Sequence, residues 1–145
     1  MRVRTHVAVS TVVSAAVYAA SGSPVMTVAS FAAGWLIDGD HGLDYLIEHG
    51  PRPDIRFFLR TFSDHLYRRA RIVLHGWEWP LVCLAVSALL QWHPAPLGLA
   101  IGWFHHLLLD QIGNTRHPLA YSLAGRALHA FRYDVFFGPG PGEAM

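Results

Sequence analysis

Four long apolar runs alternate with short polar breaks along this chain, and they cover Val7–Ala20, Val25–Ile37, Ile72–Trp92 and Leu97–Leu109. The first two are separated by Ser21–Pro24, a turn signal in which Gly and Pro interrupt the pattern. The last two are separated by Gln91–Pro96, whose two prolines forbid a continuous helix. The pattern therefore predicts four consecutive antiparallel helices, followed by one more helix across Tyr121–Phe137.

The composition favours a membrane protein over a soluble one. The chain is 52% hydrophobic and 14% charged, whereas an ordinary soluble domain is about 25% charged. The apolar runs lack the polar face of a soluble surface helix, and most tryptophans lie near their ends. Several runs are shorter than the about 20 residues of a spanning helix, which leaves a compact soluble bundle as the alternative. We expect one domain, residues 1–145, built as an all-α four-helix membrane bundle.

Charge and cysteine content exclude several other classes. The formal net charge is +1, so bulk electrostatics do not indicate a nucleic-acid partner. Cys83 is the single cysteine, which rules out a disulfide framework and a cysteine-based zinc site. Arg2 and Arg4 before an apolar stretch also resemble a secretory signal peptide. The second apolar run follows directly, however, and this favours a mature membrane segment.

A basic amphipathic helix is predicted between the second and third runs, over residues 54–72. Asp54 is a candidate N-cap, and the apolar side chains that follow recur at helical spacing: Ile55, Phe58, Leu59, Phe62 and Leu66. Arginines are interleaved with them, so such a helix could lie among lipid headgroups. A docked helix with a solvated arginine face is the alternative. Residues 138–145 are expected to form a flexible tail.

The candidate chemistry begins with Asp38-Gly39-Asp40-His41, which ends the second run. If the backbone is helical there, Asp38 and His41 share a face at i, i+3, while Asp40 points elsewhere. Zn²⁺, Mn²⁺ and Fe²⁺ accept mixed carboxylate and imidazole ligands. The alternative is a polar turn that merely closes a helix.

Ten histidines are many for this length, and their positions decide between these readings. In an up-down-up-down bundle, five histidines and their acidic neighbours fall at one end: His6 starts the first helix, Asp38, Asp40 and His41 end the second, His75 and Glu78 start the third, and His105, His106 and Asp110 end the fourth. Ionisable groups in apolar helices default to a functional interpretation. This segregation predicts a metal site with the ligands His6, Asp38, His41, His75, His106 and Asp110.

Helical spacing suggests how some of these residues act. His106 and Asp110 are i, i+4 and can ligate one ion. His75 and Glu78 are i, i+3 and can do the same, or Glu78 can act as a base. His105 is either a second ligand or an outer-shell donor, because adjacent helical residues diverge by about 100°.

These motifs resemble a bacterial family of inner-membrane, metal-dependent hydrolases. That family has a His near the N-terminus, Asp-x-Asp-His after the second apolar run, a His motif before the third, and His-x-x-x-Asp ending the fourth. The resemblance covers most of Met1–Pro118. It departs at Leu74–Trp79, which has one imidazole where the family has two, and at Gly42, where the family has proline. The pattern is also remotely similar to zinc-dependent phospholipase C and P1-type nucleases.

The resemblance implies hydrolysis of phosphoesters. Lipid-like or other small-molecule phosphoesters are the expected substrates, because the site would open at the level of the lipid headgroups. One or two divalent ions, zinc first, are the expected cofactor. Asp40 or Glu78 would serve as a bridging ligand or general base. The arginines fall on the end of the bundle that carries the site, so the positive-inside rule places it on the cytoplasmic side of the inner membrane. The alternatives are a structural metal that joins helix ends, and a metal or proton transporter, which the lack of mid-run ionisable residues disfavours.

Overall fold

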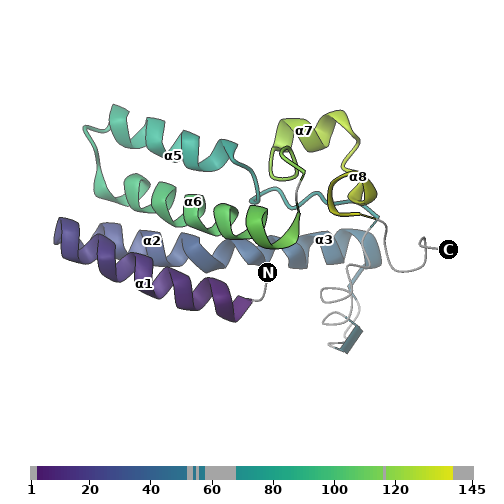
Figure 1. Ribbon diagram of the computed structural model, residues 1–145, viewed down its shortest axis with the longest axis horizontal. Coiled ribbons are helices and arrows are strands. Elements are labelled where there is room, and N and C mark those ends of the chain that lie inside the picture. The colour runs from purple at the N-terminus through teal and green to yellow at the C-terminus, as the bar shows by residue number, and fades with distance from the viewer. Residues whose placement is uncertain (1–2, 52–53, 55, 58–67, 116, 139–145) are drawn as a thin grey trace.

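Four helices lie side by side in one half of the molecule (Figure 1). They are α1 (Val3–Ser21), α2 (Pro24–Leu36), α5 (Glu78–Leu89) and α6 (Pro94–Asn114). Helix α2 packs on both α1 and α6, and α6 also packs on α5. The computed structural model describes residues 3–51, 54, 56–57, 68–115 and 117–138. Within those residues it contains helices and no strand, so the all-α prediction is confirmed for them.

The helix ends follow the signals in the sequence. The Ser23 hydroxyl accepts a hydrogen bond from the Met26 amide and caps α2, which begins at Pro24. The His93 ring caps α6 in the same way, through the Ala95 amide. Because α1 ends at Ser21, one residue before Gly22 with φ of 63°, the first turn is as tight as predicted.

The helical segment that begins with α2 continues through the Asp-Gly-Asp-His motif. It passes through a 3₁₀ turn, η1 (Ile37–Gly39), into α3 (Asp40–His49), which extends beyond the ends of the other helices (Figure 1). The motif therefore lies in the middle of a long helical segment that stops at Gly50, whose φ is 72°.

Two short helices, α7 (Leu123–Leu128) and α8 (Tyr133–Phe137), lie at the same end of the molecule as α3 (Figure 1). The single helix predicted across Tyr121–Phe137 is therefore wrong. Ala130 and Phe131 have left-handed φ values of 52° and 58°, which a continuous right-handed helix cannot contain.

The segment before α5 is a loop. Helix α5 begins at Glu78, whereas the apolar run begins at Ile72. The helix predicted over residues 54–72 falls mostly outside the described residues, and 68–72 are not helical: Arg69 forms an antiparallel bridge with Arg132. Residues 139–145 of the predicted tail also lie outside the described part of the chain.

Small and polar side chains fill the space between the four helices. Their buried serines are exposed by no more than 4%: Ser10, Ser14, Ser30 and Ser87. Helices α2 and α6 approach so closely that a Cβ added to Gly98 would lie 2.3 Å from the Met26 carbonyl oxygen. A Cβ on Gly102 would lie 2.3 Å from that of Ser30. Close contact through small residues is thus the main packing device of this half.

Large apolar side chains, by contrast, cover the outside of the same helices. Val12 is 70% exposed, Val28 is 67% exposed and Leu89 is 83% exposed. The buried apolar cluster lies instead where the end of α6 meets the C-terminal segment, and it consists of Ala70, Ile72, Leu107, Ala120, Tyr121 and Phe136.

One described helix, α1, is long and apolar enough to cross a membrane by length and composition alone. A signal sequence or the core helix of a soluble protein would meet the same criterion, and α1 lies near the N-terminus. Helices α2 and α5 contain 13 and 12 residues, fewer than the about 20 that span a hydrocarbon core.

Candidate metal centre

Four segments bring six imidazole and carboxylate side chains together at one end of the helical layer. His6 comes from α1, Asp38 from η1 and His41 from α3. His75 comes from the loop before α5, while His106 and Asp110 lie one turn apart on α6. The structure thus brings together all six side chains that the sequence predicts as metal ligands.

Two carboxylates hold the cluster together by facing several imidazoles each. Asp38 Oδ1 lies 3.4 Å from the Nε2 atoms of both His75 and His106, and 3.9 Å from that of His41. Asp110 Oδ1 lies 3.1 Å from His6 Nε2, and its Oδ2 lies 3.3 Å from His106 Nε2. The His6 and His106 rings stack at 3.9 Å.

The imidazoles present their Nε2 atoms to one another across this space. The Nε2 atoms of His75 and His106 are 3.3 Å apart. The outer nitrogen of His106, Nδ1, lies 2.9 Å from the Gly34 carbonyl oxygen, which can only accept a hydrogen bond, so Nδ1 is the donor. The Nδ1 of His75 lies 3.0 Å from Asp40 Oδ1. With Nδ1 of His106 donating to Gly34, its Nε2 lone pair points towards Nε2 of His75, where a proton or a metal cation can lie between the two rings.

Two acidic residues of α3 explain why His75 is in a loop. Asp44 Oδ2 accepts hydrogen bonds from the Arg71 and Ile72 amides, and Asp40 Oδ2 accepts one from the Leu74 amide. Because the carboxylates bind these amides, His75 is carried by a fixed, non-helical loop.

Glu78 lies outside the cluster. Its carboxylate accepts hydrogen bonds from the Ser122 hydroxyl and from the Leu123 and Ala124 amides, at the start of α7. The helical i, i+3 pairing that we predicted for His75 and Glu78 is therefore not formed, because His75 precedes the first turn of α5. Glu78 acts instead as a cap for another helix.

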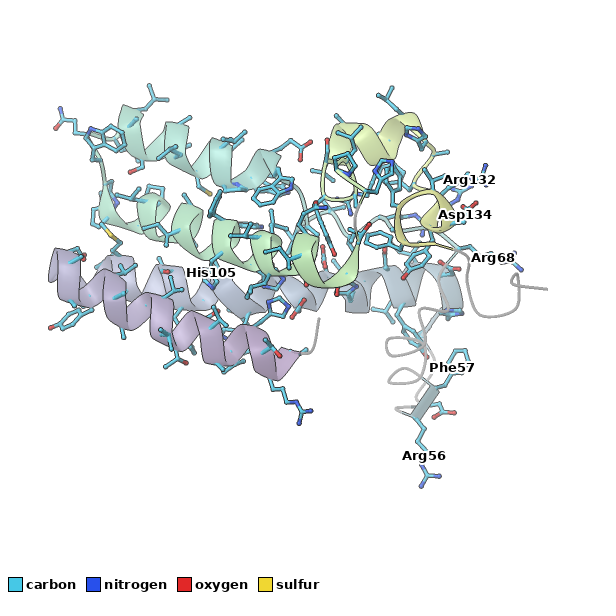
Figure 2. All side chains as sticks on the ribbon, in the orientation of Figure 1. Arg56, Phe57, Arg68, His105, Arg132 and Asp134 are labelled. Carbon is cyan, nitrogen blue, oxygen red and sulfur yellow. The ribbon has the colours of Figure 1, made fainter. Side chains whose placement is uncertain are left out.

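His105 lies between α6 and α1, and its ring nitrogens face Ser10 and Ile101 and not the cluster. Its Nε2 is 3.0 Å from the Ser10 hydroxyl, and its Nδ1 is 3.0 Å from the Ile101 carbonyl oxygen. Figure 2 shows its side chain within the layer of helices. Gly34 leaves the room for this pair, because a Cβ there would lie 2.2 Å from the Ser10 oxygen.

The pKa values of the groups outside the four long helices reflect this crowding. Burial alone would lower the pKa of His75, but the carboxylates of Asp110, Asp38 and Asp40 outweigh it and raise that pKa well above 6.5. Burial would raise the pKa of Asp38, yet the facing imidazoles hold it well below its usual range. Burial, aided by His75, lowers the pKa of His41 to about 4. The carboxylates around His75 thus favour positive charge at this point of the cluster.

The donor set fits a divalent metal. Two groups of side chains have ligand atoms within 4.8 Å of one another: His6, Asp38, His106 and Asp110 form one, and Asp38, His41 and His75 form the other. Since Asp38 belongs to both, the cluster could hold one ion or two ions joined by this carboxylate. Nitrogen and carboxylate oxygen donors of this kind suit Zn²⁺, Mn²⁺ and Fe²⁺.

Several supporting residues were not singled out from the sequence. Asn114 donates hydrogen bonds to Asp110 Oδ1 at 2.9 Å and to the Tyr121 hydroxyl at 3.0 Å. The i, i+4 spacing of Asp110 and Asn114 on α6 could have indicated this contact. Asp44 and Arg126 act on the loop that carries His75, and they lie too far from it in the chain for spacing to reveal them.

Comparisons of the chain with protein-family models, with curated proteins and with solved structures gave no match.

Proposed function

We propose that this protein is a membrane-embedded, metal-dependent hydrolase that acts on phosphoesters. The observation that carries the proposal is the convergence of six metal-binding side chains from four segments inside an otherwise apolar molecule. The motif resemblance to inner-membrane, metal-dependent hydrolases supports the same reaction class. A bound divalent ion, zinc in the first place, would polarise a phosphoryl oxygen and activate water.

The unequal exposure of the ligands supports catalysis over a purely structural metal. The side chains of His6, His75 and His106 are at most 1% exposed. Those of Asp38 and His41 are 13% and 24% exposed. A structural site is closed by protein ligands, whereas a catalytic site keeps one side open to substrate. The side of η1 and α3 is the open side of this cluster.

The residues divide into two roles in this proposal. The six clustered side chains hold the ion or ions, and Asp40 orients His75 through its outer nitrogen. Asp38, which faces three imidazoles, is the bridging ligand if two ions bind. Glu78 has no part in the reaction, because residues 122–124 occupy its carboxylate.

The distribution of side chains supports a bilayer as the solvent of the four long helices. In lipid, helices associate through small and hydroxyl-bearing residues, and large apolar side chains face outwards. Ser10, Ser30 and Gly102 lie between these helices, while Val12 and Leu89 lie outside. The short α2 and α5 then call for a locally thin bilayer or for a site that sits below the headgroups.

Arginine placement supports a site that faces the cytoplasm. Among the described residues, arginines occur at the start of α1 and in the half that holds α3, α7 and α8. The opposite turns, residues 21–24 and 90–93, contain none. By the positive-inside rule, the metal-binding end lies on the cytoplasmic side of the inner membrane.

Elemental mass spectrometry on detergent-purified protein tests the proposal, with the His106→Ala variant beside the wild type. His93→Ala, at the opposite end of α6, is the matched control. We expect one or two zinc or manganese ions per chain in the wild type and the control, and loss in His106→Ala. Hydrolysis of bis(4-nitrophenyl) phosphate should be lost with the metal.

Three outcomes would contradict parts of this proposal. No stoichiometric metal, after purification without chelators and attempted reloading, would overturn the metal centre. Unfolding of His106→Ala, rather than a folded metal-free protein, would favour a structural metal. Release of the protein from membranes by alkaline carbonate would overturn the membrane assignment.

A further inference from the structure

Arg126 is a fully buried cation that the proposed reaction does not use. It lies on α7, is 0% exposed and is the largest of the fully buried side chains. Its Nη2 atom donates hydrogen bonds to two loop carbonyls, at 3.1 Å to Ile72 and at 2.7 Å to His75. A guanidinium is rarely enclosed completely unless it is needed there, because desolvation of a charge is expensive.

The backbone of the loop that carries His75 is bound by carboxylates on one side and by a guanidinium on the other. On one side, the carboxylates of Asp44 and Asp40 accept its amides. On the other side, Arg126 binds its carbonyls, including that of His75 itself. Carboxylates match amides and a guanidinium matches carbonyls, so the loop is fixed by both kinds of backbone group.

Two tryptophans also bind this loop, but at carbonyls that precede that of His75. The indole nitrogens of Trp79 and Trp103 donate to the Val73 and Leu74 carbonyls, at 2.8 and 2.7 Å. Neither bonds to the carbonyl of His75. Among the described hydrogen bonds from side chains, only that of Arg126 reaches the His75 carbonyl.

We propose that Arg126 is a positioning residue for the metal ligand His75: its guanidinium holds the His75 carbonyl so that the imidazole Nε2 reaches the ion. This inference rests on the metal centre of the proposed function. Arg126 touches neither the ion site nor a substrate, and it acts through His75.

A double-mutant cycle on zinc affinity tests this role. The dissociation constant is measured by competition with a chromophoric chelator for wild type, Arg126→Met, His75→Ala and the double variant. We expect Arg126→Met to weaken zinc binding by about tenfold to a hundredfold, as loss of an outer-shell partner does. In the background of His75→Ala, the same change should have no further effect on zinc affinity, because its target is gone.

Arg132→Met is the matched control, since Arg132 follows α7 and pairs with Asp134 on the exposed surface. Arg126→Lys keeps the charge and should restore part of the affinity. Visible absorption of the Co²⁺-loaded protein gives a second readout, and it should show the loss of one nitrogen ligand in Arg126→Met.

Equal, additive losses from Arg126→Met in both backgrounds would overturn the inference, because they would mark a general effect on folding. So would unchanged zinc affinity in a folded Arg126→Met variant. If Arg126→Met does not fold, Arg126→Gln replaces it in the same cycle. Absence of zinc binding by the wild type would overturn the proposed function itself, and this inference with it.

Discussion

The Nδ1 atom of His75 lies 3.0 Å from Asp40 Oδ1, while Oδ2 of Asp40 accepts a hydrogen bond of 2.7 Å from the Leu74 amide. One carboxylate therefore contacts both the ring of His75, a proposed metal ligand, and the backbone beside it. A carboxylate behind a ligating imidazole sets its tautomer and raises its basicity.

Replacing Asp40 by Asn should weaken metal binding while the fold survives. The amide can still accept from Leu74, but it removes the negative charge behind His75. We expect the zinc dissociation constant to rise about tenfold to a hundredfold, measured by chelator competition. Asp134→Asn, on the exposed surface beside Arg132, is the control. An unchanged dissociation constant would show that Asp40 has no orienting role.

The metal-free protein should lose stability as the pH rises above neutrality. The pKa of His75 is raised above 6.5 in the folded state. Its protonated form therefore contributes stability that is fully present below the unfolded pKa and is lost as the pH rises through the raised value. Thermal unfolding of metal-free protein between about pH 6 and about pH 9 should show a falling Tm in this window.

Added zinc should reverse this trend, because the ion replaces the proton and binds deprotonated ligands more tightly at higher pH. The stabilisation by zinc should thus grow with pH in the same window. A metal-free Tm that rises with pH there would contradict the protonation of His75 among its carboxylates.

The Glu78→Gln variant tests whether Glu78 caps α7 or acts as a general base. Glu78 accepts three hydrogen bonds at the start of α7, so the neutral amide should lower the free energy of unfolding by about 1 kcal/mol. Zinc affinity and kcat for bis(4-nitrophenyl) phosphate should stay close to the wild-type values. A large loss of kcat in a stable, zinc-loaded variant would return Glu78 to the reaction.

Gly102→Val should separate α6 from α2. The first added carbon would already lie 2.3 Å from the Ser30 carbonyl oxygen, which belongs to the backbone and cannot move aside alone. We expect a loss of about 1–3 kcal/mol, the usual cost of overpacking, measured by denaturant unfolding in detergent. Gly39→Ala is the control, since a Cβ there meets no atom of the described residues within 4 Å.

The sequence predicts the meeting of distant ligands because antiparallel connectivity alone determines which helix ends are neighbours. His6 and Asp110 are far apart in the chain, yet both fall at the same end of such a bundle, and their side chains lie 3.1 Å apart. The end signals at Ser23 and His93 were local and could be read directly.

The sequence does not predict how the loop of His75 is built, because its structure depends on partners from other segments. Asp44 binds its amides and Arg126 binds its carbonyls, from positions before and after it in the chain. Helical spacing paired His75 with Glu78, whereas long-range hydrogen bonds separated them. Likewise, the left-handed residues Ala130 and Phe131 carry no glycine signal that would reveal the break between α7 and α8.

The candidate ligands are spread along the chain from His6 to Asp110, and this spread determines when an ion can bind during biosynthesis. A growing chain holds no complete site until α6 has left the ribosome and paired with α2. An ion that needs all of these side chains can therefore bind only after α6 has been synthesised. Arg126 is synthesised later still, so a chain truncated after α6 would carry every ligand and yet lack the guanidinium that steadies His75. Metal loading would then report that the C-terminal segment is in place.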